Sequence, residues 1–202
     1  MGGVLIVRAT KKLQRLTGLS TAPDDERGTT LLGPWFATVL SWRPRVALLV
    51  NESTLLPVLM PLAPASTLTS RIGEQVTRVL GAHHVPAAII DQEWRHMQTC
   101  QLGVTTNRSV VGVMTEFARL AEIHHDADPA IDLVALAVRL ARTPCGPLYN
   151  RNVSPDRELA AILDAIGPDR ASGVGGDGEL GEKRRSRHSR AGSRPWGWDG
   201  RA

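Results

Sequence analysis

Short apolar runs and amphipathic stretches alternate along this chain, and their spacing predicts a sheet with helices. A β-branched run at 4–7 predicts a buried strand, and a brief helix is expected over 11–19. The runs at 35–42 and 46–50 flank a short turn that contains Pro44, so they predict a β-hairpin. Because the second of these runs has no polar alternation, we expect it to be covered on both faces.

Helical spacing becomes common after the hairpin. The apolar stretch 55–62 contains two prolines, which favour an extended segment at a sheet edge or a broken turn over a long helix. Apolar residues near helical spacing then predict a helix that ends near residue 80, with Ser66 or Thr67 as its cap and Gly81 as its stop.

The remaining pattern predicts four further helices and one strand. These are a helix over 86–97, a strand over 99–105, an amphipathic helix over about 109–124, a helix capped by Asp128, and a short helix over 159–166 that is preceded by a cap at Ser154. Together the pattern predicts an α+β domain, with a small, mostly antiparallel sheet from the N-terminal half packed against helices from the C-terminal half.

The composition changes sharply at residue 167. Residues 167–202 hold nine glycines with many Arg and Ser and almost no aliphatic side chains. Such a segment buries too little apolar surface to offset the entropy cost of ordering it. We therefore expect one globular α+β domain over 1–166 and a disordered Gly/Arg/Ser-rich tail over 167–202.

The net charge also differs between the predicted domain and the tail. The chain has a formal net charge of +4, and residues 168–202 contribute +3 of it, so the predicted domain is nearly neutral. This balance gives no electrostatic reason to expect that the domain binds nucleic acid. The basic run at 183–190 would allow weak, non-specific contact with nucleic acid, although a solvated tail is the favoured interpretation.

The number of cysteines and the length of the apolar runs favour a cytoplasmic location. Cys100 and Cys145 are too few for a disulfide framework, which favours a reducing cytoplasm. The apolar run near the N-terminus is too short for a secretory signal, and no stretch approaches the roughly 18 apolar residues of a membrane span. We expect a cytoplasmic protein without a membrane partner.

Several motifs resemble chemistry but lack its context. The glycines at 173–178 match G-x-G-x-x-G, yet no strand precedes them and no helix follows. The histidine pairs at 83–84 and 124–125 lie at predicted helix C-termini, where a charged imidazolium complements the helix dipole. Adjacent histidines on a helix point in different directions, so the two members of a pair cannot readily share a metal. Cys145 stands between two prolines, which suggests a buried thiol in a rigid turn. We therefore predict no catalytic residue, no cofactor and no metal.

The most distinctive part of the chain is a polar segment that stands directly before the helix of 109–124. One interpretation is structural. Asn107 or Ser109 would cap the helix, and Arg108 would pair with an acid such as Glu116 or Glu52.

The other interpretation of this segment is an anion-binding pocket at the helix start. Free N–H groups at a helix N-terminus, together with an arginine, favour phosphate or carboxylate. Gly112, one turn further, costs helix stability unless something packs closely against it, so we expect a tight helix–sheet contact there. The candidate ligand-binding residues are Asn51, Asn107, Arg108, Ser109 and Glu116.

Four blocks of sequence resemble an uncharacterised bacterial family, domain of unknown function 6933. The blocks are Arg8–Leu13, Leu32–Leu40, Leu49–Leu55 and Thr106–Phe117. They span residues 1 to about 120, and the length of the predicted domain also suits this family. The family has no established activity, so the resemblance implies a fold and transfers no catalytic residue.

These observations identify no reaction. They favour a non-catalytic binding or interaction domain in the cytoplasm, whose partner is left open between another protein and a second copy of the chain. One alternative is a small enzyme or ligand-binding protein that uses the anion pocket. The other is nucleic-acid association through the basic tail.

Overall fold

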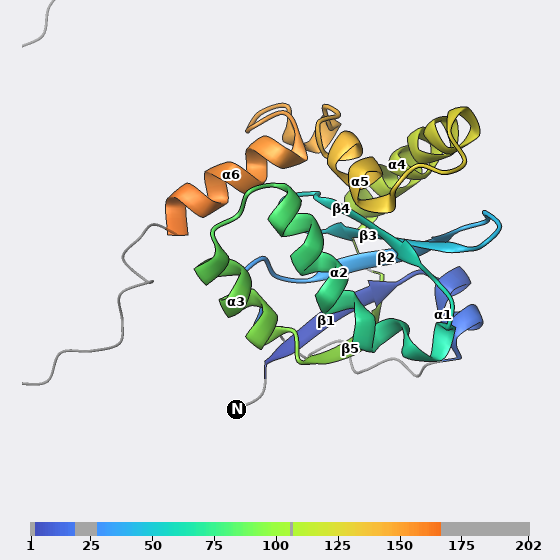
Figure 1. Ribbon diagram of the computed structural model, residues 1–202. Coiled ribbons are helices and arrows are strands. Elements are labelled where there is room, and N and C mark those ends of the chain that lie inside the picture. The colour runs from blue at the N-terminus through green and yellow to red at the C-terminus, as the bar shows by residue number, and fades with distance from the viewer. Residues whose placement is uncertain (1–2, 19–27, 106, 167–202) are drawn as a thin grey trace, which may run out of the picture. The chain divides into compact units, whose positions relative to one another are not determined.

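The computed structural model describes residues 3–18, 28–105 and 107–166, all within one compact unit. In these ranges the chain forms a five-stranded sheet with six α-helices around it (Figure 1). The elements are β1 (Val4–Ala9), α1 (Lys11–Thr17), β2 (Trp35–Leu40), β3 (Val46–Asn51), β4 (Pro57–Pro61), α2 (Leu68–Ala82), α3 (Ala87–His96), β5 (Thr99–Val104), α4 (Arg108–Ala127), α5 (Leu133–Ala141) and α6 (Pro155–Ile166).

The sheet is mixed, with the strand order β4-β3-β2-β1-β5. The pairs β2–β3 and β3–β4 are antiparallel, whereas β1 pairs in parallel with both β2 and β5. The two parallel pairs arise because a helix-containing crossover precedes β2 and the helices α2 and α3 precede β5. The expected α+β class is confirmed, and the antiparallel strands are the three that follow one another directly along the chain.

The predicted hairpin is the centre of the sheet. Phe36 pairs with Val50 and Leu40 with Val46, and all six residues of β3 are buried. Helix α2 crosses the front of the sheet in Figure 1, and α4 packs against β2 and β3. The expectation that β3 is covered on both faces is therefore confirmed.

The stretch 55–62 supplies the edge strand that its prolines predict. Pro57 and Pro61 are the first and last residues of β4, so neither interrupts the ladder to β3 from within the strand. Helix α5 runs along β4 and also contacts α2 and α4. This edge of the sheet is thus covered by a helix, which is a common protection against pairing with another chain.

Two predicted helix boundaries are wrong. Gly81 does not stop α2, which continues to Ala82; the left-handed residue near this end is His84, with a φ of 59°. Asp128 does not cap α5. Its carboxylate accepts a hydrogen bond from the amide of Ala130 at 3.1 Å in a local turn after α4, and Asp132 caps α5 through the amide of Ala135 at 2.8 Å.

Some expectations fall outside the described residues. These are the disordered tail at 167–202, its glycine motif at 173–178 and its basic run at 183–190. Of the predicted helix over 11–19, the structure describes Lys11–Thr17 as helical. No helix in the described ranges is both long enough and apolar enough to cross a membrane.

Gly81→Ala should raise the free energy of unfolding by roughly 0.5–1 kcal/mol, because Gly81 is helical and a Cβ there meets nothing within 4 Å. Gly33→Ala is the matched opposite, since Gly33 has a φ of 77° and alanine there should cost about 1–2 kcal/mol. Urea denaturation of both variants measures the two signs. A loss of stability in Gly81→Ala would show that this glycine does terminate the helix.

Candidate functional site

A pocket of about 410 Å³ lies along the first turns of α4. Arg108, Gly112 and Glu116 recur every four residues and therefore line one side of it. The segment between α5 and α6 forms the opposite side. The residues that line the pocket are Arg108, Ser109, Gly112, Val113, Glu116, Phe117, Thr143, Pro144, Cys145, Gly146, Pro147 and Tyr149.

Asn107 begins the helix rather than lining the pocket. Its side-chain oxygen accepts hydrogen bonds from the amides of Ser109 at 3.0 Å and Val110 at 3.4 Å. Its side-chain nitrogen donates to the carboxylate of Glu52 at 3.0 Å, which ties the start of α4 to the turn after β3. The capping interpretation of Asn107 is therefore confirmed, and this cap satisfies two of the amides that a bound anion would otherwise use.

Arg108 lies open at the pocket. Its side chain is exposed and makes no ion pair or hydrogen bond with another residue of the described ranges. The acids expected to pair with it are engaged elsewhere: Glu52 accepts from Asn107, and Glu116 pairs with Arg119 at 3.4 Å. The predicted ion pair of Arg108 is thus wrong, and its guanidinium faces solvent beside the pocket.

Asn51 is fully buried at the end of β3 and is not among the residues that line the pocket. Its side-chain nitrogen donates to the carbonyls of Leu32 at 3.0 Å and Pro34 at 3.4 Å. Its side-chain oxygen accepts from the amide of Ser53 and from both the amide and hydroxyl of Thr54, at 2.9 to 3.1 Å. Asn51 therefore organises the β3–β4 turn instead of facing a ligand.

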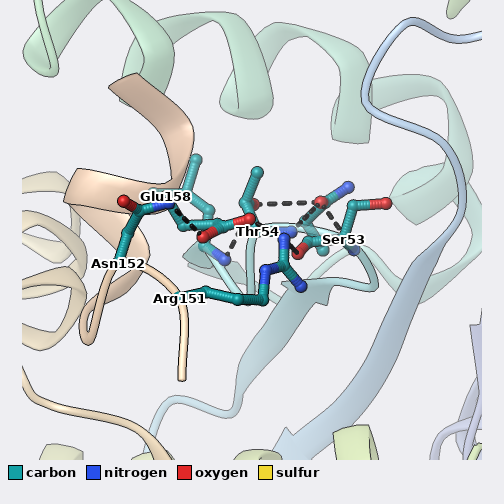
Figure 2. Close-up of polar contacts among 7 residues, drawn as sticks. Ser53, Thr54, Arg151, Asn152 and Glu158 are labelled. Atoms are coloured by element: carbon teal, nitrogen blue, oxygen red, sulfur yellow. Dashed lines mark hydrogen bonds and ion pairs between the residues drawn. The ribbon is translucent and has the colours of Figure 1, made fainter. Parts of the chain in front are cut away.

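An ion pair between a half-exposed arginine and a buried glutamate fixes the far wall of the pocket. Figure 2 shows Arg151 between Glu158 and the turn at Ser53 and Thr54. Arg151 pairs with Glu158, whose side chain is only 3% exposed, and also donates to the carbonyl of Ser53 at 3.5 Å. Asn152 donates to the other carboxylate oxygen of Glu158 at 2.7 Å. These contacts hold the loop after Tyr149 against the β3–β4 turn.

Gly112 has a different role from the expected one. It is exposed, and a Cβ built on it would meet nothing within 4 Å, so no tight helix–sheet contact exists at this position. The amphipathic pattern of α4 turns Val110, Val113 and Phe117 toward the core and leaves Gly112 on the pocket side. The glycine contributes open space to the pocket.

Cys145 and Tyr149 place a thiol and a phenol hydroxyl in the opposite wall of the pocket. Burial, with a smaller contribution from the Glu116 carboxylate, raises the pKa of the Cys145 thiol to about 11. The thiol donates a weak hydrogen bond to the carbonyl of Thr143 at 3.5 Å. Tyr149 is 63% exposed and adds a hydroxyl to the polar groups near the pocket mouth.

The histidine pairs lie at helix ends, as expected. His124 and His125 are in the last turn of α4, and His83 is the residue that follows α2. Burial lowers the pKa of His83, so His83 favours the neutral form and does not supply the expected dipole-complementing charge. The described residues contain no group of three or more His, Cys, Asp or Glu side chains placed to hold a metal ion.

A second, larger depression was not anticipated from the sequence. It has a volume of about 920 Å³ and lies where α1, the β2–β3 turn and the chain after β4 meet. The residues that line it are Lys12, Arg15, Leu16, Val39, Ser41, Trp42, Arg43, Pro44, Arg45, Leu62, Ala63 and Ala65. We call it the basic groove. The Arg-Pro-Arg sequence of the turn was its only local signal.

The family model described as a domain of unknown function (DUF6933) matches residues 6–158. The chain belongs to this family. The match confirms the resemblance seen in the sequence, and it includes both walls of the pocket at α4 and the whole lining of the basic groove. Searches of curated proteins and of solved structures found no match for this DUF6933 protein.

Asn51→Ala should lower the free energy of unfolding of the DUF6933 domain by about 3 kcal/mol, because it leaves buried carbonyl and amide groups without partners. Chemical denaturation measures this loss. Ser53→Ala is the matched control, since Ser53 is exposed and its contact with Asn51 uses the backbone; its effect should stay within about 0.5 kcal/mol. Equal effects of the two variants would contradict a structural role for Asn51.

Both thiols of the folded domain should react slowly with iodoacetamide at pH 8. Burial raises the pKa of Cys100 to about 12, and that of Cys145 is about 11. Relative to a thiol of pKa 9.0, the thiolate fraction of Cys145 should therefore be about 100-fold lower. Mass spectrometry of native and urea-unfolded protein compares the rates, and a native rate close to the unfolded rate would contradict this environment.

Proposed function

We propose that this DUF6933 protein is a non-catalytic binding domain that holds a small anionic molecule in the pocket at the start of α4. The observation that carries this proposal is the state of Arg108. Its guanidinium is exposed beside a 410 Å³ pocket and has no ion-pair partner among the described residues. That volume is in the usual range for small-molecule sites, which is about 300–1,000 Å³.

The first turn of α4 reinforces the charge of Arg108. A helix N-terminus carries a partial positive charge, and Arg108 is the first residue of α4, so both favour an anion at this end of the helix. An arginine can bind carboxylate or phosphate through two parallel hydrogen bonds. Ser109 adds a hydroxyl beside it. The Asn107 cap occupies two first-turn amides, so the proposal gives the main role to the side chains of Arg108 and Ser109.

Glu116 defines the other end of the pocket. It lies eight residues after Arg108 on α4, which places the two Cα atoms about 12 Å apart along the helix. A carboxylate there repels a second anionic group and accepts hydrogen bonds from N–H groups. The arrangement suits a ligand with an anionic group at the Arg108 end and an N–H donor or a positive charge at the Glu116 end.

The chemistry of the lining supports binding over catalysis. Cys145 is the most nucleophilic residue type there, and its raised pKa keeps it a neutral thiol near pH 7. No histidine or lysine is among the described residues that line the pocket, and the acid beside the thiol, Glu116, raises the pKa of Cys145 instead of lowering it.

We also propose that the protein works in the cytoplasm and that a protein partner or a second copy of the chain accompanies the small ligand. Cys100 and Cys145 are both free thiols, which supports a reducing compartment. The near-neutral domain supports a protein over a nucleic acid as partner, apart from weak contact through the basic run at 183–190.

The pocket is tested by titrating ¹⁵N-labelled full-length protein with sodium acetate and inorganic phosphate as minimal anions. Amide shifts should concentrate at Ser109 and Gly112, with dissociation constants of about 1 mM because these probes are so small. Arg108→Gln should abolish the shifts at both amides. Arg95→Gln removes an exposed arginine of α3 outside the pocket and should leave them unchanged.

Filling the pocket at the start of α4 with a larger side chain tests the proposed anion site independently of Arg108. Gly112→Leu places a side chain where a Cβ meets no atom within 4 Å, so the helix should be retained while the pocket is filled. Thr115→Leu is the matched control, because Thr115 is exposed on α4 and does not line the pocket. If acetate and phosphate shift the same amides in Arg108→Gln and Gly112→Leu as in the wild type, the proposed site is wrong.

A further inference from the structure

The basic groove brings together residues from three separate parts of the chain. Lys12 and Arg15 come from α1, Arg43 and Arg45 from the β2–β3 turn, and Ala63 and Ala65 from the chain after β4. Figure 1 shows α1 near the tip of the β2–β3 hairpin, on the side of the sheet remote from α6. The groove is therefore distinct from the pocket at the start of α4, with which it shares no lining residue.

Charge in the groove is of one sign. Four cationic side chains line it, and no acidic residue is among the described residues that do so. Four positive charges around one depression repel one another and destabilise the unliganded fold. The domain as a whole is close to neutral, so this arrangement is a local concentration of charge rather than a consequence of composition.

The cations are available to a ligand. The Arg15, Arg43 and Arg45 side chains are exposed and make no ion pair or hydrogen bond with other residues in the described part of the chain. Lys12 is held in place, because its ammonium donates to the hydroxyl of Ser41 at 2.8 Å and to the carbonyl of Val39 at 3.3 Å. An ammonium has three N–H donors, so Lys12 keeps one for a ligand.

Trp42 supplies an aromatic surface among these charges. Its ring stacks on the imidazole of His125, with ring centroids 4.2 Å apart and an interplanar angle of 15°. This stack connects the hairpin turn to the last turn of α4 and fixes the orientation of the indole. A tryptophan held in this way offers a pre-ordered surface for a planar ring at a small entropy cost.

We propose that the basic groove binds a small molecule that carries several phosphate groups, of the class of nucleoside triphosphates. Arginines match phosphate oxygens through paired hydrogen bonds, and four cations neutralise a charge that a single carboxylate or phosphate does not carry. The tryptophan accommodates the base. The volume of about 920 Å³ suits one ligand of this size.

A small polyphosphate fits the observations better than a nucleic acid. Nucleic-acid interfaces use a basic stripe that extends along the surface, and their affinity depends on many separate phosphate contacts. Here the four cations gather around one depression on a domain whose overall net charge is close to zero. We therefore assign the groove to one compact ligand.

Isothermal titration calorimetry of the full-length protein with ATP and with tripolyphosphate, in about 0.15 M salt without divalent metal, tests this proposal. Arg43→Gln and Arg15→Gln should each weaken binding of both ligands by about tenfold, as expected for one charge-assisted contact. Arg157→Gln, which removes an exposed arginine of α6 outside the groove, should change affinity less than about twofold. The basic tail is present in every variant, so differences among them report on the groove.

Two further measurements separate the sources of affinity. Melting temperatures of Arg43→Gln and Arg15→Gln should equal or exceed that of the wild type, because each change relieves like-charge repulsion. Trp42→Leu should weaken binding of ATP more than binding of tripolyphosphate, because the ring contacts the base. Equal effects on the two ligands would overturn the nucleoside part of the proposal.

Absence of binding by both ligands would overturn the proposal, as would binding that Arg43→Gln and Arg15→Gln leave unchanged. A single-stranded oligonucleotide is titrated in parallel. If it binds more tightly than ATP and loses this affinity in Arg43→Gln, the groove belongs to a nucleic-acid surface and the small-molecule assignment is wrong.

Discussion

The buried amide of Asn51 is the interaction on which most of the remaining architecture depends. It joins the carbonyls of Leu32 and Pro34, just before β2, to the turn that leads into β4. The same turn carries Glu52, which receives Asn107 at the start of α4, and Ser53, which receives Arg151 before α6. One side chain thus sets the turn from which both walls of the α4 pocket are positioned.

Polar atoms at this depth stabilise a fold only when they are satisfied, and here most of them are. The amide of Asn51 uses its donors and its acceptor, and Glu158 has Arg151 and Asn152 as partners. Two opposing effects act on the pKa of the buried Glu93 carboxyl. Burial raises the pKa of its carboxyl, while the amides of Leu31 and Leu32 oppose that rise by donating to it. Such groups specify how loops attach to the sheet.

Sequence patterns predicted those features that short segments determine. The hairpin, the edge placement of β4 and the Asn107 cap all follow from residues close together in the chain. Features that depend on distant segments were not accessible in this way. The parallel pairing of β1 with β5 joins residues about 95 positions apart, and net charge conceals the basic groove because acids elsewhere in the domain balance its four cations. Gly112 was misread because its sequence context does not show which face of α4 it occupies.

The end of α6 bears on how the domain is to be isolated. The family match ends at Glu158, yet α6 continues to Ile166 and packs Leu159, Ile162 and Leu163 against the core. A fragment cut at the family boundary would keep the acid that pairs with Arg151 but lose the helix that holds this acid in place. It would also uncover an apolar surface where those three side chains pack. Expression boundaries for this protein are therefore better drawn from the last helical residue, Ile166, than from the last residue that the family model matches.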